Sequence, residues 1–177
     1  IFYPKSSRYV DMKRVRTGLM PDLADADMSH ATDASQMRHI DRVGVFVDAT
    51  VQDIITHVVA FKLDAVQLHG SESPTFIRNL RSTIVPDIRP EDIQGYEHAS
   101  ADDIARCAQY EGLVDMFVFD TKCTGYGGSG MQFDWSLLDS YQGTVPFLLS
   151  GGIGPDDAER IKSISHKRFA GIDLNSR

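Results

Sequence analysis

Cysteine, tryptophan and long hydrophobic runs are all scarce in this chain of 177 residues. It contains one tryptophan and two cysteines, Cys107 and Cys123, which form no CxxC motif. A disulfide framework is therefore excluded, and a cytoplasmic location is the expectation from cysteine usage. The six histidines show no metal-ligand spacing, so we expect no metal. No apolar run reaches the ~20 residues of a transmembrane helix, so we expect no membrane partner.

Positive charge is also scarce. Lysine and arginine number 18 against 25 aspartate and glutamate, giving a formal net charge of -7 without any basic cluster. This balance argues against nucleic acid as a partner. A small anionic substrate remains compatible, because backbone amides and one or two arginines can bind it locally.

Short apolar runs rich in Val, Ile and Phe predict strands buried on both faces. Between them lie amphipathic segments that predict helices beginning near Thr50, Ser73, Ser100 and Gly154. Only residues 83–85 resemble a strand between residues 82 and 99, and residues 11–41 show no helical stripe. The predicted strands are Ile1–Tyr3, Val43–Val47, Ala65–Leu68, Met116–Phe119, Pro146–Leu149 and Gly171–Leu174.

This alternation of strands and helices predicts parallel strands with right-handed crossovers. Several strands end in polar residues or glycines, which is typical of a shared site at the carboxyl ends of barrel strands. The expected fold is therefore α/β, a (β/α)8 TIM barrel forming a single domain over residues 1–177. A complete barrel usually needs roughly 200 to 250 residues, so we expect this one to be incomplete.

Asp120 is the principal catalytic candidate, because it ends the apolar strand Met116–Phe119. A carboxyl group in a partly apolar pocket can have a raised pKa and act as a general acid. An aspartate that only caps its own loop is the alternative. The glycine-rich segment Gly125–Gly130 follows at once, and its presence favours a catalytic role for Asp120. The segment itself is either a flexible lid or a plain surface loop.

A second candidate region could bind phosphate. Ser150, Gly151 and Gly152 end one strand, and Gly154-Pro155 then opens a helix. Glycines let an anion approach the backbone, and a helix start offers N–H groups. The polar end of the last strand fits the same role through Asp173, Asn175 and Ser176.

Three further residues are weaker candidates for substrate binding. Arg8 could hold a carboxylate, although a solvated loop arginine is the commoner case. Gln67 and His69 lie on one predicted strand, and we expect one to face the barrel lumen and the other the helices, unless the strand ends before His69. A structural role for His69 is at least as well supported.

Together these motifs resemble the phosphoribosylanthranilate isomerase family of tryptophan biosynthesis. Each motif is weak alone, but eight occur in the family's order over nearly the whole chain. They are Phe2–Tyr9, Arg42–Val47, Ala65–Gly70, Asp120–Lys122, Gly127–Gly130, Phe133–Trp135, Leu149–Gly152 and Gly171–Ser176.

The resemblance implies an Amadori rearrangement of N-(5-phosphoribosyl)anthranilate to 1-(2-carboxyphenylamino)-1-deoxyribulose 5-phosphate, without a cofactor or metal. Asp120 matches the family's general acid, and Arg8 its contact to the anthranilate carboxylate. Phosphate binding maps to Gly151 and Gly152, with Asn175 or Ser176. We expect a cytoplasmic monomer or weak homo-oligomer with this small molecule as its partner.

The sequence departs from the family at the general base. The family's base is a cysteine in a Lys-x-Cys-Gly motif on its first strand, and neither Cys107 nor Cys123 fits it. We therefore expect strand one, and possibly strand five near residues 86–90, to be missing from these residues. The alternatives are another ribulose-phosphate-binding barrel, of the histidine-pathway isomerase or indoleglycerol-phosphate synthase type, and a non-catalytic fragment acting as a partner subunit.

Overall fold

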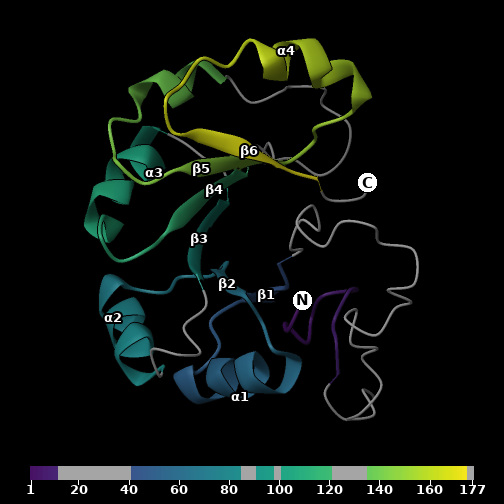
Figure 1. The fold of residues 1–177 in the computed structure, drawn as a ribbon, viewed down its shortest axis with the longest axis vertical. Helices are drawn as coiled ribbons and strands as arrows, with labels where there is room; N and C mark the ends of the chain where they lie inside the picture. The colour runs from purple at the N-terminus through teal and green to yellow at the C-terminus, as the bar shows by residue number, and fades with distance from the viewer. Residues whose placement is uncertain (12–40, 85–90, 98–100, 121–134, 175–177) are drawn as a thin grey trace, which may run out of the picture.

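Six parallel strands form a single sheet in which spatial order follows chain order (Figure 1). The computed structural model describes residues 1–11, 41–84, 91–97, 101–120 and 135–174. The strands are β1 (Val43–Phe46), β2 (Ala65–Leu68), β3 (Glu91–Glu97), β4 (Met116–Asp120), β5 (Phe147–Ser150) and β6 (Phe169–Asp173). The helices are α1 (Val51–Phe61), α2 (Pro74–Thr83), α3 (Ala101–Arg106) and α4 (Ala158–Lys162), with 3-10 turns η4 (Cys107–Tyr110), η5 (Trp135–Ser140) and η6 (Pro155–Asp157).

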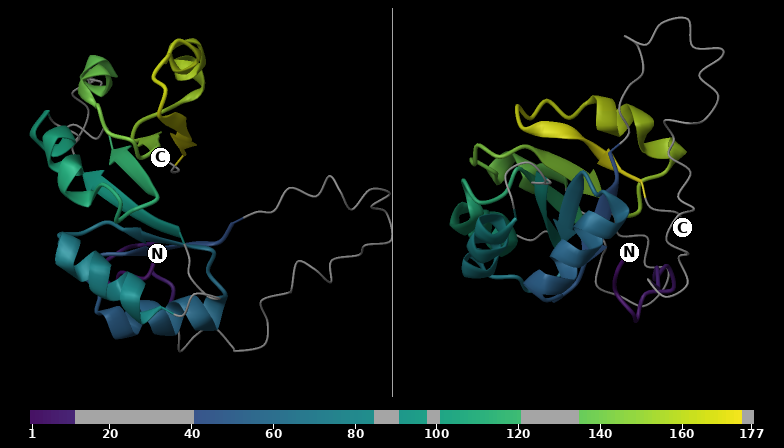
Figure 2. Two further views of the ribbon diagram at one scale, coloured as in Figure 1. Left: turned by 60° about the vertical axis from the view of Figure 1, so that its left-hand side comes forward. Right: turned by 60° about the horizontal axis from the view of Figure 1, so that its bottom comes forward.

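The expected (β/α)8 barrel is wrong for the described residues, in which the sheet is open. Neighbouring strands pair from β1 through to β6, but β1 and β6 stand at the two ends of the order and do not pair with each other. A barrel requires its first and last strands to join. The sheet is nevertheless curved, and the helices lie on its outer side (Figure 2). Parallel pairing between all neighbours confirms the predicted parallel strands.

Two strand predictions also need correction. Residues Ile1–Tyr3 form no strand, although the Phe2 amide donates to the Val45 carbonyl at 2.8 Å and so lies beside β1. The strand that we expected to be possibly missing near residues 86–90 is present as β3, whose residues Glu91–Glu97 are mostly polar. This strand forms because both neighbours pair with it, Ala65 opposite Glu91 and Met116 opposite Ile93. Pairing on both edges outweighs its weak propensity.

Hydroxyl caps position the first two helices as predicted. Thr50 accepts the Asp53 amide at 3.1 Å at the start of α1, and Ser73 accepts the Phe76 amide at 3.2 Å ahead of Pro74 in α2. Each cap satisfies a backbone donor that has no partner within its helix. Helix α1 ends at Lys62, which is left-handed with φ of 49°. The predicted cap at Ser100 lies outside the described residues.

The main core lies between the sheet and the helices. Side chains alternate along each strand, so every second residue faces the helix layer. In β4 these are Phe117 and Phe119, both completely buried, and the Phe119 ring lies 5.2 Å from the ring of Phe147 in β5. Helices α1 and α2 contribute further core residues, which are Ile54, Val58, Ile77 and Leu80.

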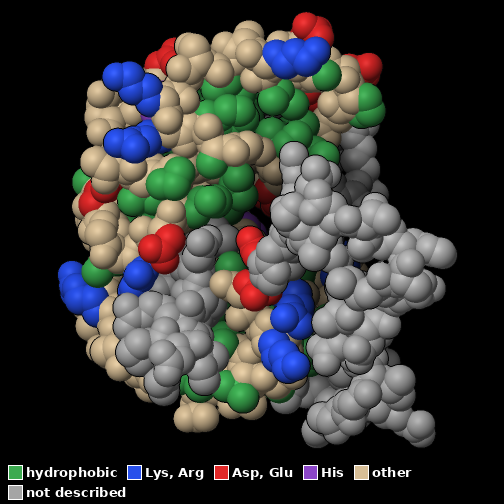
Figure 3. All heavy atoms as spheres, viewed as in Figure 1, with side chains coloured by type: hydrophobic (Ala, Val, Ile, Leu, Met, Phe, Trp, Pro, Cys, Tyr) green, Lys and Arg blue, Asp and Glu red, His purple; other side chains and the backbone are tan. Residues whose placement is uncertain are grey.

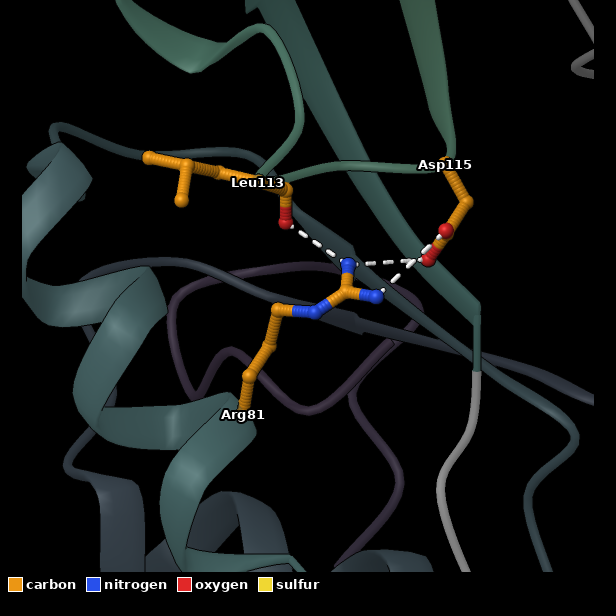
Figure 4. Close-up of polar contacts among 3 residues, drawn as sticks. All are labelled: Arg81, Leu113 and Asp115. Atoms are coloured by element: carbon orange, nitrogen blue, oxygen red, sulfur yellow. Dashed lines mark hydrogen bonds and ion pairs between the residues drawn. The ribbon is translucent and has the colours of Figure 1, made fainter. Parts of the chain in front are cut away.

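An ion pair joins α2 to the chain just before β4 (Figure 4). Arg81, in the last turn of α2, donates to the Leu113 carbonyl at 2.7 Å and to the Asp115 carboxylate at 3.0 Å. Its side chain is only 23% exposed, so solvent screens these bonds less than it screens an ordinary surface pair. The contact fixes α2 relative to the amino end of β4.

We expect Arg81→Ala to lower the free energy of unfolding by about 1–2 kcal/mol, because a charged hydrogen bond to a carbonyl is lost with the ion pair. The matched control is Arg78→Ala on the same helix, at an exposed position, where a change within ~0.5 kcal/mol is expected. Denaturant unfolding measures both. Equal effects of the two substitutions would contradict a structural role for this contact.

Candidate functional site

Three polar side chains lie side by side where β4, β5 and β6 end. The parallel register places Asp120 opposite Ser150, and Ser150 opposite Asp173. The Ser150 hydroxyl donates to the Asp173 carboxylate at 3.0 Å. Asp120 is 6% exposed and Ser150 only 2%. Buried polar groups at the carboxyl edge of a parallel sheet are typical of an α/β binding site.

The alternation within β4 explains why Asp120 faces away from the helices. Phe117 and Phe119 fill the core on the outer face. Residues between and beyond them must point to the inner face, and these are Val118 and Asp120. Val118 belongs to a separate small apolar cluster with Ala65, packed by Met116 and Leu148. Figure 3 shows hydrophobic side chains gathered over β4 to β6.

A cavity of about 260 Å³ lies on this inner face of the sheet. Its walls combine an apolar part with polar groups from the strand ends and from the first residues of the chain. It therefore brings together most of the residues that the sequence nominated. The polar lining residues are Arg8, Gln67, His69, Asp120, Ser150 and Asp173, and the apolar ones are Ile1, Val43, Val45, Val118 and Leu148.

Gln67 and His69 both line this cavity, so the expectation that they face opposite sides is wrong. Side chains alternate with a period of two, and residues two apart therefore share a face. Val66 and Leu68 take the other face and are completely buried in the core.

Arg8 reaches the cavity because the first residues are anchored beside β1. The Phe2 ring packs 5.1 Å from both Phe46 and Phe61, and its amide bonds to β1. A turn follows in which the Arg8 amide donates to the Ser6 hydroxyl at 3.1 Å. Arg8 itself is exposed, so its guanidinium stands at the rim rather than inside the core.

The predicted phosphate loop follows β5 directly. Gly151 and Gly152 have φ of 88° and 65°, a backbone conformation that strongly favours glycine. Apart from Gly152 itself and its two chain neighbours, no described residue has an atom within 4 Å of where a Cβ on Gly152 would stand. The Gly154 amide is already bound, since it donates to the buried Asp157 carboxylate at 2.8 Å. Asn175, Ser176, Cys123 and the predicted lid Gly125–Gly130 lie outside the described residues.

The sequence did not nominate a pair of carboxylates at the ends of β1 and β2. Asp48 lies two residues after β1, and Glu72 lies near the end of the loop from β2 to α2, directly before the cap residue Ser73. The Glu72 carboxylate accepts the amides of Asp48 at 2.8 Å and Gly70 at 2.9 Å, while Asp48 accepts the amide and hydroxyl of Ser71, both at 2.8 Å. We call this set of residues, Asp48, Gly70, Ser71 and Glu72, the loop clamp. The available signal in the sequence was an acidic residue in each of the two loops that follow β1 and β2.

A larger cavity of about 600 Å³ lies at the opposite edge of the sheet, beside residues that precede β4 and β5, including Glu111 and Thr144. That edge supports stability in folds of this kind. Within the described residues, no three His, Cys, Asp or Glu side chains are grouped to hold a metal ion. No described helix is both long and apolar enough to cross a membrane.

A curved parallel sheet with outer helices and a cavity lined by polar groups at its carboxyl edge is typical of α/β enzymes that act on small molecules. The family model for N-(5'-phosphoribosyl)anthranilate isomerase matches residues 11–177. The chain belongs to this family, and its function is that isomerisation in tryptophan biosynthesis. This decides against the histidine-pathway and indoleglycerol-phosphate synthase alternatives.

Relatives of known sequence and structure agree with the family match. N-(5'-phosphoribosyl)anthranilate isomerase of Parabacteroides distasonis is 45% identical over 99% of this chain and 72% of its own length. Monomers generated from the dimeric enzyme of Thermotoga maritima are 26% identical, with a TM-score of 0.65 over 98% of this chain and 72% of theirs. A further isomerase structure, solved with reduced 1-(o-carboxyphenylamino)-1-deoxyribulose 5-phosphate, is 27% identical with a TM-score of 0.67, over 99% of this chain and 73% of its own.

The loop clamp predicts a pH effect on stability. Hydrogen bonds from the Ser71 amide and hydroxyl lower the pKa of Asp48 below its ordinary value, against a slight opposing effect of burial. A carboxyl group with a lower pKa when folded adds stability above its unfolded-state pKa of ~3.9, and this contribution is lost as the pH falls through the folded-state pKa. We expect Asp48→Asn to be less stable than the parent at pH 7 and equally stable near pH 2, as measured by denaturant unfolding. The same difference at both pH values would contradict this assignment.

Proposed function

We propose that Asp120 is the general acid of the isomerisation. The observation that carries this proposal is its position: a nearly buried carboxyl group on the inner face of β4, in the cavity that also contains Ser150 and Asp173. A general acid must stand within hydrogen-bond reach of the atom it protonates, and a cavity lined by this carboxyl group provides that reach.

In the proposed first step Asp120 gives its proton to the furanose ring oxygen. The bond between this oxygen and C1 breaks, and the lone pair of the anthranilate nitrogen forms a C1=N double bond, giving an open-chain Schiff base. Loss of the C2 proton to a base then moves the C2–H electrons into a C1=C2 bond and neutralises the nitrogen. The resulting enolamine tautomerises to the ketose. We assign Asp120 only to the first step.

Substrate binding is proposed for the other cavity residues according to their chemistry. Arg8 at the rim suits the anthranilate carboxylate, because a guanidinium can donate two parallel hydrogen bonds to it. Gln67, His69 and Asp173 offer polar groups for the sugar hydroxyls. Support comes from the related isomerase whose bound compound carries a carboxyphenyl group and a phosphate.

The phosphate is proposed to bind at Gly151 and Gly152, directly after the buried Ser150. Their left-handed backbone lets an anion approach closely, without a Cβ in the way. The Gly154 amide is excluded from this role because Asp157 already occupies it. Asn175 and Ser176 stay sequence predictions for the same phosphate.

Three broader proposals rest on the same observations. Residues 1–177 belong to a single domain, because all six strands share one sheet. The low cysteine content and the biosynthetic family favour the cytoplasm. A monomer or weak homo-oligomer is our proposal for the assembly, and the dimeric Thermotoga maritima relative shows that the family includes dimers.

Asp120→Asn in the full-length protein is expected to lower kcat by about 10² to 10⁴-fold with little change in substrate affinity, because the amide cannot give up a proton. Steady-state assays that follow anthranilate fluorescence measure this. The control is Asp139→Asn at an exposed position of η5, where normal turnover is expected. Near-normal turnover of Asp120→Asn would remove Asp120 from the mechanism.

Gly152→Ala is expected to raise KM about tenfold, because a Cβ disfavours φ of 65° and displaces the phosphate-binding amides. Gly112→Ala is a matched control: its φ is 73°, it also has open space around its Cβ position, and it lies just before β4 at the opposite edge of the sheet. Both substitutions should cost about 1–3 kcal/mol of stability. An unchanged KM in Gly152→Ala, or an equal rise in both variants, would refute a phosphate site at this loop.

A further inference from the structure

The loop clamp joins the loops that follow β1 and β2 in both directions. Glu72, from the second loop, holds the amide of Asp48 in the first. Asp48 in turn holds the amide and hydroxyl of Ser71 in the second. Because each loop supplies a carboxylate to the other, neither can move without breaking bonds at both ends.

The clamp is closely fitted as well as reciprocal. Asp48 is left-handed with φ of 48°, and its amide in that conformation points to Glu72. A Cβ on Gly70 would stand 2.6 Å from the Asp48 carboxylate oxygen and 2.8 Å from its amide nitrogen, so only glycine fits there. On the far side, the buried Tyr110 hydroxyl donates to the Glu72 carbonyl at 3.0 Å.

Glu72 is only 5% exposed. Burying a carboxylate is costly unless its oxygens are hydrogen-bonded, and here one oxygen takes the Asp48 amide and the other the Gly70 amide. A buried ionic group gives weak support to stability, and its better-attested contribution is to select one geometry. The geometry selected here is that of the peptide between His69 and Gly70.

His69 lies between two fixed points. Its own amide donates to the Phe46 carbonyl of β1 at 2.8 Å, and the next amide, of Gly70, donates to Glu72 at 2.9 Å. The first bond restrains φ of His69 and the second restrains its ψ. These two angles set the direction of the Cα–Cβ bond, and the His69 side chain lines the cavity with Asp120.

We propose that Glu72 is a positioning residue for the isomerase, acting through the Gly70 amide to hold the His69 imidazole in the substrate cavity, with Asp48 as the reciprocal half of the clamp. Glu72 is not among the residues that line the cavity, so it acts through His69 rather than on substrate. This inference rests on the proposed substrate-binding role of His69.

The test is Glu72→Gln in the full-length protein. The replacement keeps the size of the side chain but cannot accept both amides, because one end becomes a donor. We expect KM to rise about tenfold, with kcat less affected, since a substrate-binding group is displaced. In substrate-free protein we expect the NMR cross-peak of the His69 ring, assigned by its absence in His69→Gln, to move relative to the parent.

The matched control is Glu111→Gln. Glu111 is also a carboxylate that holds a loop, accepting the Thr144 amide at 3.0 Å and the Tyr141 hydroxyl at 3.3 Å, but it lies at the opposite edge of the sheet. It should lose stability while keeping the parent KM and the parent position of the His69 ring cross-peak. If Glu72→Gln does not fold, Asp48→Ala removes the acceptor of both Ser71 bonds, which form the other half of the clamp, and carries the same expectations.

An unchanged His69 ring cross-peak or an unchanged KM in the clamp variants would overturn the proposal and leave the clamp a stabilising feature only. Failure of the proposed substrate-binding role of His69 gives a different result. In that case His69→Gln itself would retain the parent KM, although the His69 ring cross-peak still moves in Glu72→Gln.

Discussion

The parallel hydrogen-bond register of the central strands is the constraint on which the rest of the molecule depends. It places Asp120, Ser150 and Asp173 in one row, although these residues lie far apart in the chain. The same register, with alternation of side chains, sends Phe117 and Phe119 into the core and Asp120 into the cavity. A slip of one residue would exchange these faces, burying the acid among aromatic rings. The same strand register therefore determines both the packing of the core and the position of the Asp120 carboxyl group.

The two edges of the sheet are held by different means. At the amino edge, Arg81 and Glu111 connect helices and loops to the chain ahead of the strands. At the carboxyl edge the loop clamp uses backbone amides and a buried carboxylate, Glu72, next to a cavity lined by His69. The amino-edge contacts lie away from the cavity, whereas the clamp fixes backbone angles beside it. Such division between a stabilising edge and a functional edge is typical of parallel α/β folds.

The curved sheet forms the cavity although it does not close into a barrel in the described residues. The six strands leave β1 and β6 unjoined in the described residues, yet the inner face still gathers polar groups from β2, β4, β5 and β6. The segment anchored by Phe2 adds Arg8 to the rim. The buried carboxyl group of Asp120 and the guanidinium group of Arg8 therefore line the same cavity.

Local patterns in the sequence determined the buried strands, the caps at Thr50 and Ser73, and the strand-end position of Asp120, because each depends on neighbouring residues alone. Only the tertiary structure decided that β3 forms, since its pairing comes from strands on either side. It also decided that the described sheet stays open, and that Asp48 and Glu72 meet. These outcomes depend on contacts between distant segments, whose geometry is set by strand register and sheet curvature rather than by any local run of residues.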